Sequence, residues 1–79
     1  MKLEILTPDK SLFSGKVRSI RVPGEKGAFM VLLNHAPIIS NLAKGDIVFT
    51  TQDYKEETIA IGGGVIEVKK NSIVVLADV

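Results

Sequence analysis

The chain has 79 residues, of which 46% are apolar, and its ten basic and nine acidic side chains leave a formal net charge of +1. This length allows one small domain, and the apolar share is too high for a disordered segment. The near-neutral charge argues against a nucleic-acid-binding protein, the absence of cysteine excludes disulfides and thiolate metal sites, and no apolar run approaches the roughly 20 residues that cross a membrane.

The chain begins with alternating apolar and polar residues, the pattern of a β-strand with one buried face. Leu3 and Ile5 carry this alternation, and the turn sequence of residues 7–10 ends it. A short apolar pair then precedes an expected break at residues 14–15. Farther on, Val17 differs in parity from Ile20 and Val22, which predicts a β-bulge near residues 18–19.

The segment of residues 37–43 is the only one whose pattern fits a helix, and it has room for about two turns. Ile47 and Phe49 then alternate with polar residues, as in a strand. The adjacent carboxylates of Glu56 and Glu57 point to opposite faces of the following strand, so they cannot act as a paired general acid and base. We expect them to form a solubilising edge that blocks strand-to-strand aggregation.

Three consecutive glycines at residues 62–64 precede the last predicted strands. The residues that follow are not the Lys-Ser/Thr pair of a phosphate-binding loop, and a strand follows instead of a helix. We therefore expect these glycines to allow a bulge or a close approach of two backbones. The final apolar run, residues 73–76, has the pattern of a strand that is buried on both faces.

Short strands with turns between them, roughly every eight to twelve residues, are typical of a β-sandwich or a small barrel. We predict an all-β fold, a flattened β-sandwich of about ten short strands that forms a single domain over residues 1–79.

Residues that could carry chemistry are few. His35 has no second His, no Cys and no paired carboxylate near it in the sequence, so a metal or catalytic set is not favoured. It is interpreted either as a loop histidine that bonds to the backbone or as a partner contact. Ser14 and Ser40 also lack a nearby base. Lys10 and Lys70, at predicted turns, leave open a small β carrier or docking domain in which one turn lysine is modified.

Several motifs follow one another along nearly the whole chain. They are Leu3 to Pro8, Leu12 to Gly15, Val22 to Gly24 with Gly27 and Phe29, His35 to Ser40, Gly45, Gly62 to Val68, and Val75 to Asp78. Each motif alone is weakly specific, but their order and spacing together resemble the N-terminal β-sandwich domain of the epsilon subunit of F-type ATP synthases.

This resemblance implies a non-catalytic rotor subunit in the central stalk, which couples the gamma subunit to the membrane c-ring during proton-driven ATP synthesis. It implies no enzyme activity and no cofactor. The family's gamma-facing surface would fall on Thr7, His35, Ala36, Pro37 and Ser40. The family's loop toward the c-ring would fall on Gly24, Glu25, Lys26, Gly27 and Ala28.

The resemblance also implies a peripheral position on the cytoplasmic side of a bacterial inner membrane, with the plastid thylakoid membrane as the alternative. Membrane contact is expected only through the complex. Family members usually continue into two helices that can inhibit rotation; the chain ends at Val79, so no self-inhibition by that route is expected. The chain departs from the family pattern at Met30, Leu33 and Asn34, where Asn34 can adopt a left-handed backbone conformation.

Overall fold

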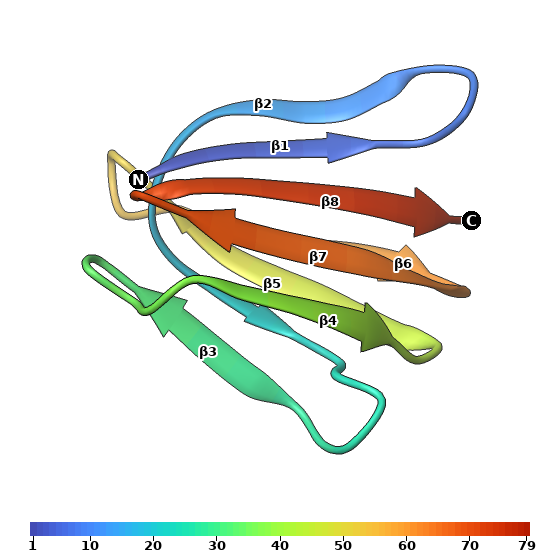
Figure 1. The fold of residues 1–79 in the computed structure, drawn as a ribbon. Helices are drawn as coiled ribbons and strands as arrows, with labels where there is room; N and C mark the ends of the chain where they lie inside the picture. Colours follow the sequence, from blue (N-terminus) through green and yellow to red (C-terminus); the bar gives the residue numbers. More distant parts are fainter.

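The computed structural model describes residues 1–79 and contains eight β-strands and no helix (Figure 1). The predicted all-β fold is confirmed, with eight strands where about ten were expected. The strands are β1 (Lys2–Leu6), β2 (Ser11–Val22), β3 (Phe29–Leu32), β4 (Ile38–Leu42), β5 (Gly45–Thr51), β6 (Glu56–Ile61), β7 (Gly63–Lys69) and β8 (Ser72–Asp78).

The long strand β2 belongs to both layers of the sandwich. Its first half pairs with β1, and its second half lies between β3 and β5. The register with β5 shifts between Val17 and Ser19, which confirms the predicted bulge. The expected break at residues 14–15 is absent because these residues pair with Glu4 and Leu3, and this continuity lowers the strand count.

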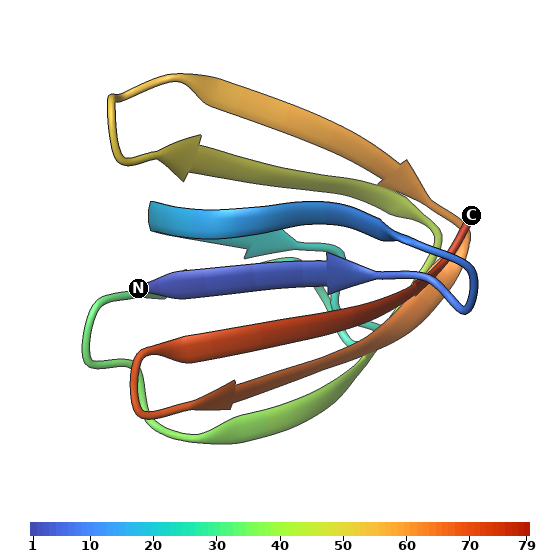
Figure 2. The same cartoon turned by 90° about the horizontal axis from the view of Figure 1, so that it is seen from above.

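The front sheet has the order β4-β7-β8-β1 and ends on the first half of β2, whereas the back sheet consists of β3, the second half of β2, β5 and β6. Strands β1 and β8 are parallel and all other pairs are antiparallel. Figure 2 shows the two layers curling around a common interior. At the edge of the sandwich where β2 does not join the two sheets, an isolated bridge between Gly24 and Leu42 ties the end of β2 to β4.

The core consists of apolar side chains from both sheets, and no polar side chain is buried. Phe49 is the largest fully buried side chain, and its ring centroid lies 4.4 Å from that of Phe13. The buried residues are Leu3, Ile5, Val17, Ile20, Val22, Val31, Leu42, Ile47, Phe49, Ile61, Ile66, Val68, Ile73, Val75 and Ala77. They hold the two sheets together by removing apolar area from water.

The helix considered for residues 37–43 does not form. This segment is instead β4, which pairs with β7 from Ile38 opposite Val68 to Leu42 opposite Gly64. Cross-strand pairing gives the backbone its hydrogen bonds and buries Leu42, so tertiary context overrides the local helical pattern.

The final apolar run is not buried on both faces, so that interpretation was wrong. Ile73 and Val75 are fully buried, but Val74 is half-buried and the side chain of Leu76 is 55% exposed. The reason is that no layer of this chain covers the outer face of β8.

Other expectations based on local pattern are confirmed. Strand β6 lies at an edge of the back sheet, and both Glu56 and Glu57 are exposed on it. Among the three glycines, Gly64 has a φ of 151°, and a Cβ added there would collide with the carbonyl oxygen of Leu76. Two backbones therefore approach closely at this point, as predicted. Asn34 has the left-handed φ of 66° that its residue type tolerates.

Candidate protein-binding surface

The turn between β3 and β4 carries three of the residues assigned to a gamma contact. The amide of His35 donates to the carbonyl oxygen of Leu32 (3.1 Å), and the amide of Asn34 donates to the Oδ1 atom of Asn71 (2.8 Å). His35 Nδ1 lies 2.7 Å from the carbonyl oxygen of Ala36. Because a carbonyl oxygen only accepts, Nδ1 carries the proton in this contact. His35 thus bonds to the backbone in a fixed turn. This agrees with its interpretation as a loop histidine that bonds to the backbone.

Thr7 and Ser40 lie apart from this turn. Strand β1 begins beside Asn71, where the amide of Lys2 donates to the Asn71 carbonyl (3.0 Å), so Thr7 follows the opposite end of β1. There its Oγ1 accepts from the amide of Lys10 (3.1 Å) and fixes the β1–β2 turn. Ser40 is half-buried beside residues 24–27. The structure therefore does not bring the five residues together into one patch.

The loop assigned to the c-ring, residues 24–28, has a fixed backbone. The amide of Gly27 donates to the carbonyl oxygen of Gly24 (2.9 Å), and the amide of Glu25 donates to the carbonyl oxygen of Asn41 (3.0 Å). Gly24 is buried, and a Cβ there would lie 2.8 Å from the ring of Phe29. The residues from Glu25 to Ala28 are exposed. The loop thus presents side chains of opposite charge on a rigid support, at the end of β4 away from His35.

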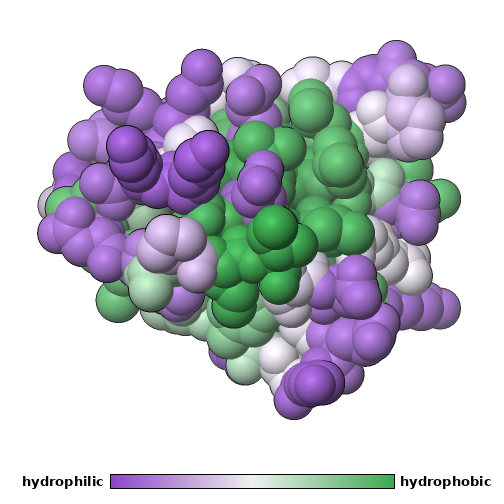
Figure 3. Space-filling view, in the orientation of Figure 1, coloured by the Kyte–Doolittle hydropathy of each residue, from purple (hydrophilic) through white to green (hydrophobic).

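A surface that the sequence did not predict lies on the outer face of the front sheet. Val65 of β7 is opposite Leu76 of β8, which is in turn next to Leu6 of β1. Val74 lies one pleat farther along β8, and Ile39 of β4, 72% exposed, lies diagonally beside Val65. We name these five residues the apolar patch. Figure 3 shows an apolar area over this face, with hydrophilic residues around it and hydrophilic atoms at one place within it.

The apolar patch connects the separated ends of the predicted gamma contact. A shallow groove of about 320 Å³ joins Leu6, Val65 and Leu76 to Thr7. At the other border, a groove of about 560 Å³ joins Ile39 to Pro37. The signal in the sequence was β8 itself, because its continuous apolar run fits a strand covered on both faces and the chain covers only one. Exposed apolar side chains that gather on one sheet face are typical of a protein-binding surface. One carboxylate, that of Glu67, lies among them, opposite Ile39 and Val74.

The structure offers little for catalysis or metal binding. No group of three or more His, Cys, Asp or Glu side chains is placed to hold a metal ion. The structure contains no helix long and apolar enough to span a membrane.

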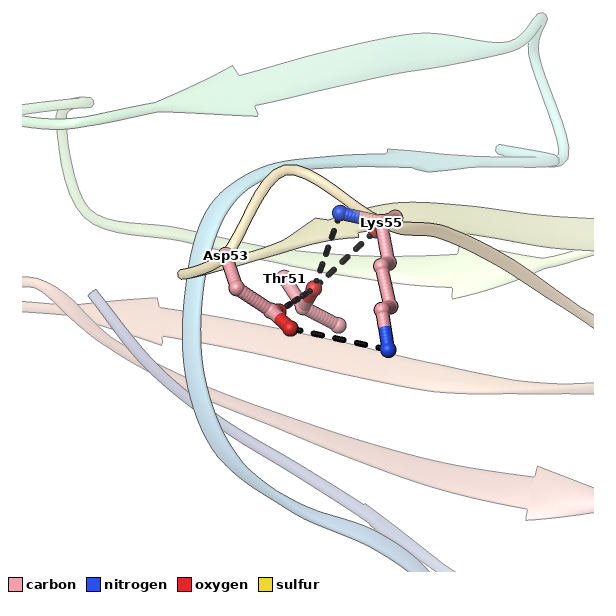
Figure 4. A network of polar contacts seen from close by, with 3 residues as sticks. All are labelled: Thr51, Asp53 and Lys55. Atoms are coloured by element: carbon pink, nitrogen blue, oxygen red, sulfur yellow. Dashed lines mark hydrogen bonds and ion pairs between the residues drawn. The ribbon is translucent and has the colours of Figure 1, made fainter.

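Asp53, a carboxyl group with a lowered pKa, is at the β5–β6 turn, away from the apolar patch (Figure 4). The hydroxyl of Thr51 donates to Asp53 Oδ1 (2.5 Å), and Lys55 Nζ lies 3.8 Å from Oδ2. The Thr51 hydrogen bond is the main cause that lowers the pKa of Asp53 below its ordinary value of 3.8; a backbone hydrogen bond and the Lys55 charge act in the same direction. The turn is exposed, so this is a local stabilisation.

We predict that Thr51→Val raises the pKa of Asp53 toward 3.8, and that Lys55→Gln raises it less because the charge is the weaker cause. A folded pKa below the unfolded one stabilises the fold above pH 3.8, and the gain is lost as the pH falls from 3.8 through the lowered pKa. NMR titration of the Asp53 carboxyl carbon measures both shifts. Equal shifts in the two variants would contradict the hydrogen bond as the main cause.

The family model for the β-sandwich domain of the ATP synthase delta/epsilon chain matches residues 1–79. The ATP synthase epsilon chain of Dichelobacter nodosus is 42% identical over 74 residues, which are 94% of this chain and 52% of that protein. The epsilon chain of Chlorobaculum tepidum is 40% identical over 76 residues, 96% of this chain and 86% of that protein. That of Wolinella succinogenes is 44% identical over 78 residues, 99% of this chain and 60% of that protein.

The chain thus spans about half of the first of these relatives and three fifths of the third. Two solved structures have a similar fold. A chain of the Euglena gracilis mitochondrial ATP synthase superposes with a TM-score of 0.86 at 20% identity, over 95% of this chain and 48% of that chain. A chain of the Tetrahymena thermophila mitochondrial ATP synthase central stalk and c-ring gives 0.80 at 15% identity, over 100% and 63%.

Proposed function

Because this chain belongs to the family of ATP synthase delta/epsilon chain β-sandwich domains, we propose that it acts as a coupling element of the rotor, which joins the gamma subunit to the c-ring. The family resemblance read from the sequence is confirmed, and with it the assignment to a non-catalytic subunit. Membership of this family also favours the stalk interpretation over a carrier domain with a modified turn lysine.

The exposed apolar patch is the observation that carries the proposal. Leu76 and Ile39 are 55% and 72% exposed on the outer face of the front sheet, where water contacts side chains of a type usually found inside. A subunit that turns with gamma needs a lasting interface, and stable interfaces bury about 800 Å² on each partner. We assign gamma to this face, with Thr7 at one border and residues 35–37 at the other. Ser40 would be reached from the edge of β4.

The second surface in this proposal is the loop of residues 24–28. Glu25 and Lys26 offer one carboxylate and one ammonium group, which suit the polar loops of a c-ring and give a small contact that weakens with salt. The loop lies at the far end of β4, and only Ile39 and Ser40 of the residues assigned to gamma line the same groove as residues 24–27, so most of the two contact surfaces are separate. One stiff, closely packed domain can thus transmit torque between them. The complex would hold the chain at the membrane periphery, on the cytoplasmic side in a bacterium or, alternatively, at a plastid thylakoid membrane.

Reconstitution of proton-driven ATP synthesis tests this function. A bacterial F-type ATP synthase freed of its own epsilon chain is placed in vesicles, a proton gradient is applied, and ATP formation is measured with and without the 79-residue chain. We expect the chain to raise the synthesis rate of the depleted enzyme. A rate that stays at the depleted level, while the native epsilon chain restores it, would contradict the proposed function.

A further inference from the structure

Three lysines form a row across the front sheet at the end where β1 begins. Lys69 of β7 pairs with Ser72 of β8, Ser72 is next to Lys2 of β1, and Lys2 pairs with Lys16 of β2. All four side chains are exposed. We name Lys69, Lys2 and Lys16 the lysine row. Its members come from distant parts of the sequence, and only the strand register makes them neighbours.

The lysine row has no anionic partner within the chain. The one ion pair of the structure joins Asp53 and Lys55 at the β5–β6 turn. Glu4 and Glu67 lie on the same face of their strands as lysines of the row, but two residues along, and neither forms an ion pair. Directly opposed like charges such as those of Lys2 and Lys16 disfavour pairing of their strands. The ammonium groups of the lysine row would therefore be stabilised by an anionic surface that covers them.

The lysine row continues the apolar patch. Lys69 lines the same groove of about 560 Å³ as Pro37 and Ile39. Along the strands, the outer face of the front sheet thus changes from apolar, around Leu76, through a mixed row that contains Val74, Glu67 and Glu4, to cationic at Lys2. A partner that covers both needs an apolar centre with carboxylates toward one side. Such a pattern fixes the orientation of the partner as well as its affinity.

We propose that the lysine row binds carboxylates of the gamma subunit and sets the direction in which gamma lies on the front sheet. This inference rests on the proposed function. The loop of residues 24–28 is at the opposite end of the sandwich from the row. When that loop faces the ring, the row is turned away from the membrane, so protein carboxylates can reach it and lipid phosphates cannot.

The test measures the affinity of the chain for purified gamma subunit at low and at high salt. The triple variant Lys2→Gln, Lys16→Gln and Lys69→Gln is compared with a control that loses the same charge elsewhere, Arg21→Gln, Lys44→Gln and Lys55→Gln. At low salt we expect the row variant to bind roughly tenfold or more weakly and the control to stay within about twofold of the unmodified chain. In about 1 M salt, the difference should largely disappear.

The other possible outcomes of the binding measurements each contradict the proposal. Equal affinity of the row variant and the unmodified chain at low salt would overturn the role of the row and leave the proposed function intact. No binding of gamma by the unmodified chain would overturn both. Vesicles with anionic lipid provide the alternative partner; binding to them that depends on the row, with gamma binding unchanged, would assign the row to lipid and overturn the proposal. Thermal unfolding of the row variant, expected to be at least as stable as the unmodified chain because Lys2 and Lys16 no longer repel each other, excludes misfolding as the cause.

Discussion

Replacing Gly64 by alanine is expected to lower the free energy of unfolding by about 3–5 kcal/mol, most of the stability of a domain this small. Gly64 has a φ of 151°, a region that side chains with a Cβ rarely adopt. The added methyl group would collide with the carbonyl oxygen of Leu76 and lie 3.1 Å from the Cα atom of Ala77. Both are backbone atoms of the paired strand β8, so the contact can be relieved only by breaking the β7–β8 pairing.

Gly62→Ala is the matched control for this prediction. A Cβ at Gly62 would lie 3.5 Å from the carbonyl oxygen of Asp78, an ordinary van der Waals contact. We expect this variant to stay within about 1 kcal/mol of the unmodified chain in urea unfolding. If Gly64→Ala were as stable as Gly62→Ala, this would contradict the inference that the backbones of β7 and β8 approach closely at Gly64.

Leu76→Glu is expected to weaken binding of the gamma subunit at least a hundredfold, about 2.7 kcal/mol or more. Leu76 lies at the centre of the apolar patch, between Val65 and Leu6 on the neighbouring strands. In the complex, the new carboxylate would be buried without a partner and would lose its hydration. In the free chain the position is 55% exposed, so the fold should be little affected. Titration calorimetry with purified gamma, together with thermal unfolding, measures both effects.

Leu32→Glu gives the same chemical change on the other side of the molecule. Leu32 is 53% exposed on β3, in the back sheet. We expect its binding of gamma to stay within about twofold of the unmodified chain, because its exposed side chain is on the outer face of the back sheet and only its backbone carbonyl contacts His35. Loss of binding in Leu32→Glu with full binding in Leu76→Glu would place gamma on the back sheet and contradict the assignment.

Features set by neighbouring residues could be predicted from the sequence. The parity change between Val17 and Ile20 revealed the bulge, and the charged pair at residues 56–57 revealed an edge strand. The strand β4 was missed, because its apolar spacing also fits a short helix and only pairing with β7 decides between the two. In a segment of five residues, local preference is weaker than the cross-strand hydrogen bonds.

The candidate surfaces depend on register between distant strands, which local patterns do not contain. Lys2 and Lys69 are brought into one row by the parallel pairing of β1 with β8. The same pairing places Leu6 beside Leu76. The residues transferred from the family, by contrast, were found where turns could be expected, except for Ser40 in β4, but their mutual positions could not be inferred. Thr7 and His35 therefore lie at opposite ends of the front sheet, with the apolar patch between them.

Native mass spectrometry of the two purified proteins would show whether this domain is a partner of the gamma subunit. We expect a one-to-one complex that persists in size exclusion and is lost with Leu76→Glu. A chain that remains monomeric beside gamma, under conditions where a native epsilon chain forms the complex, would contradict it.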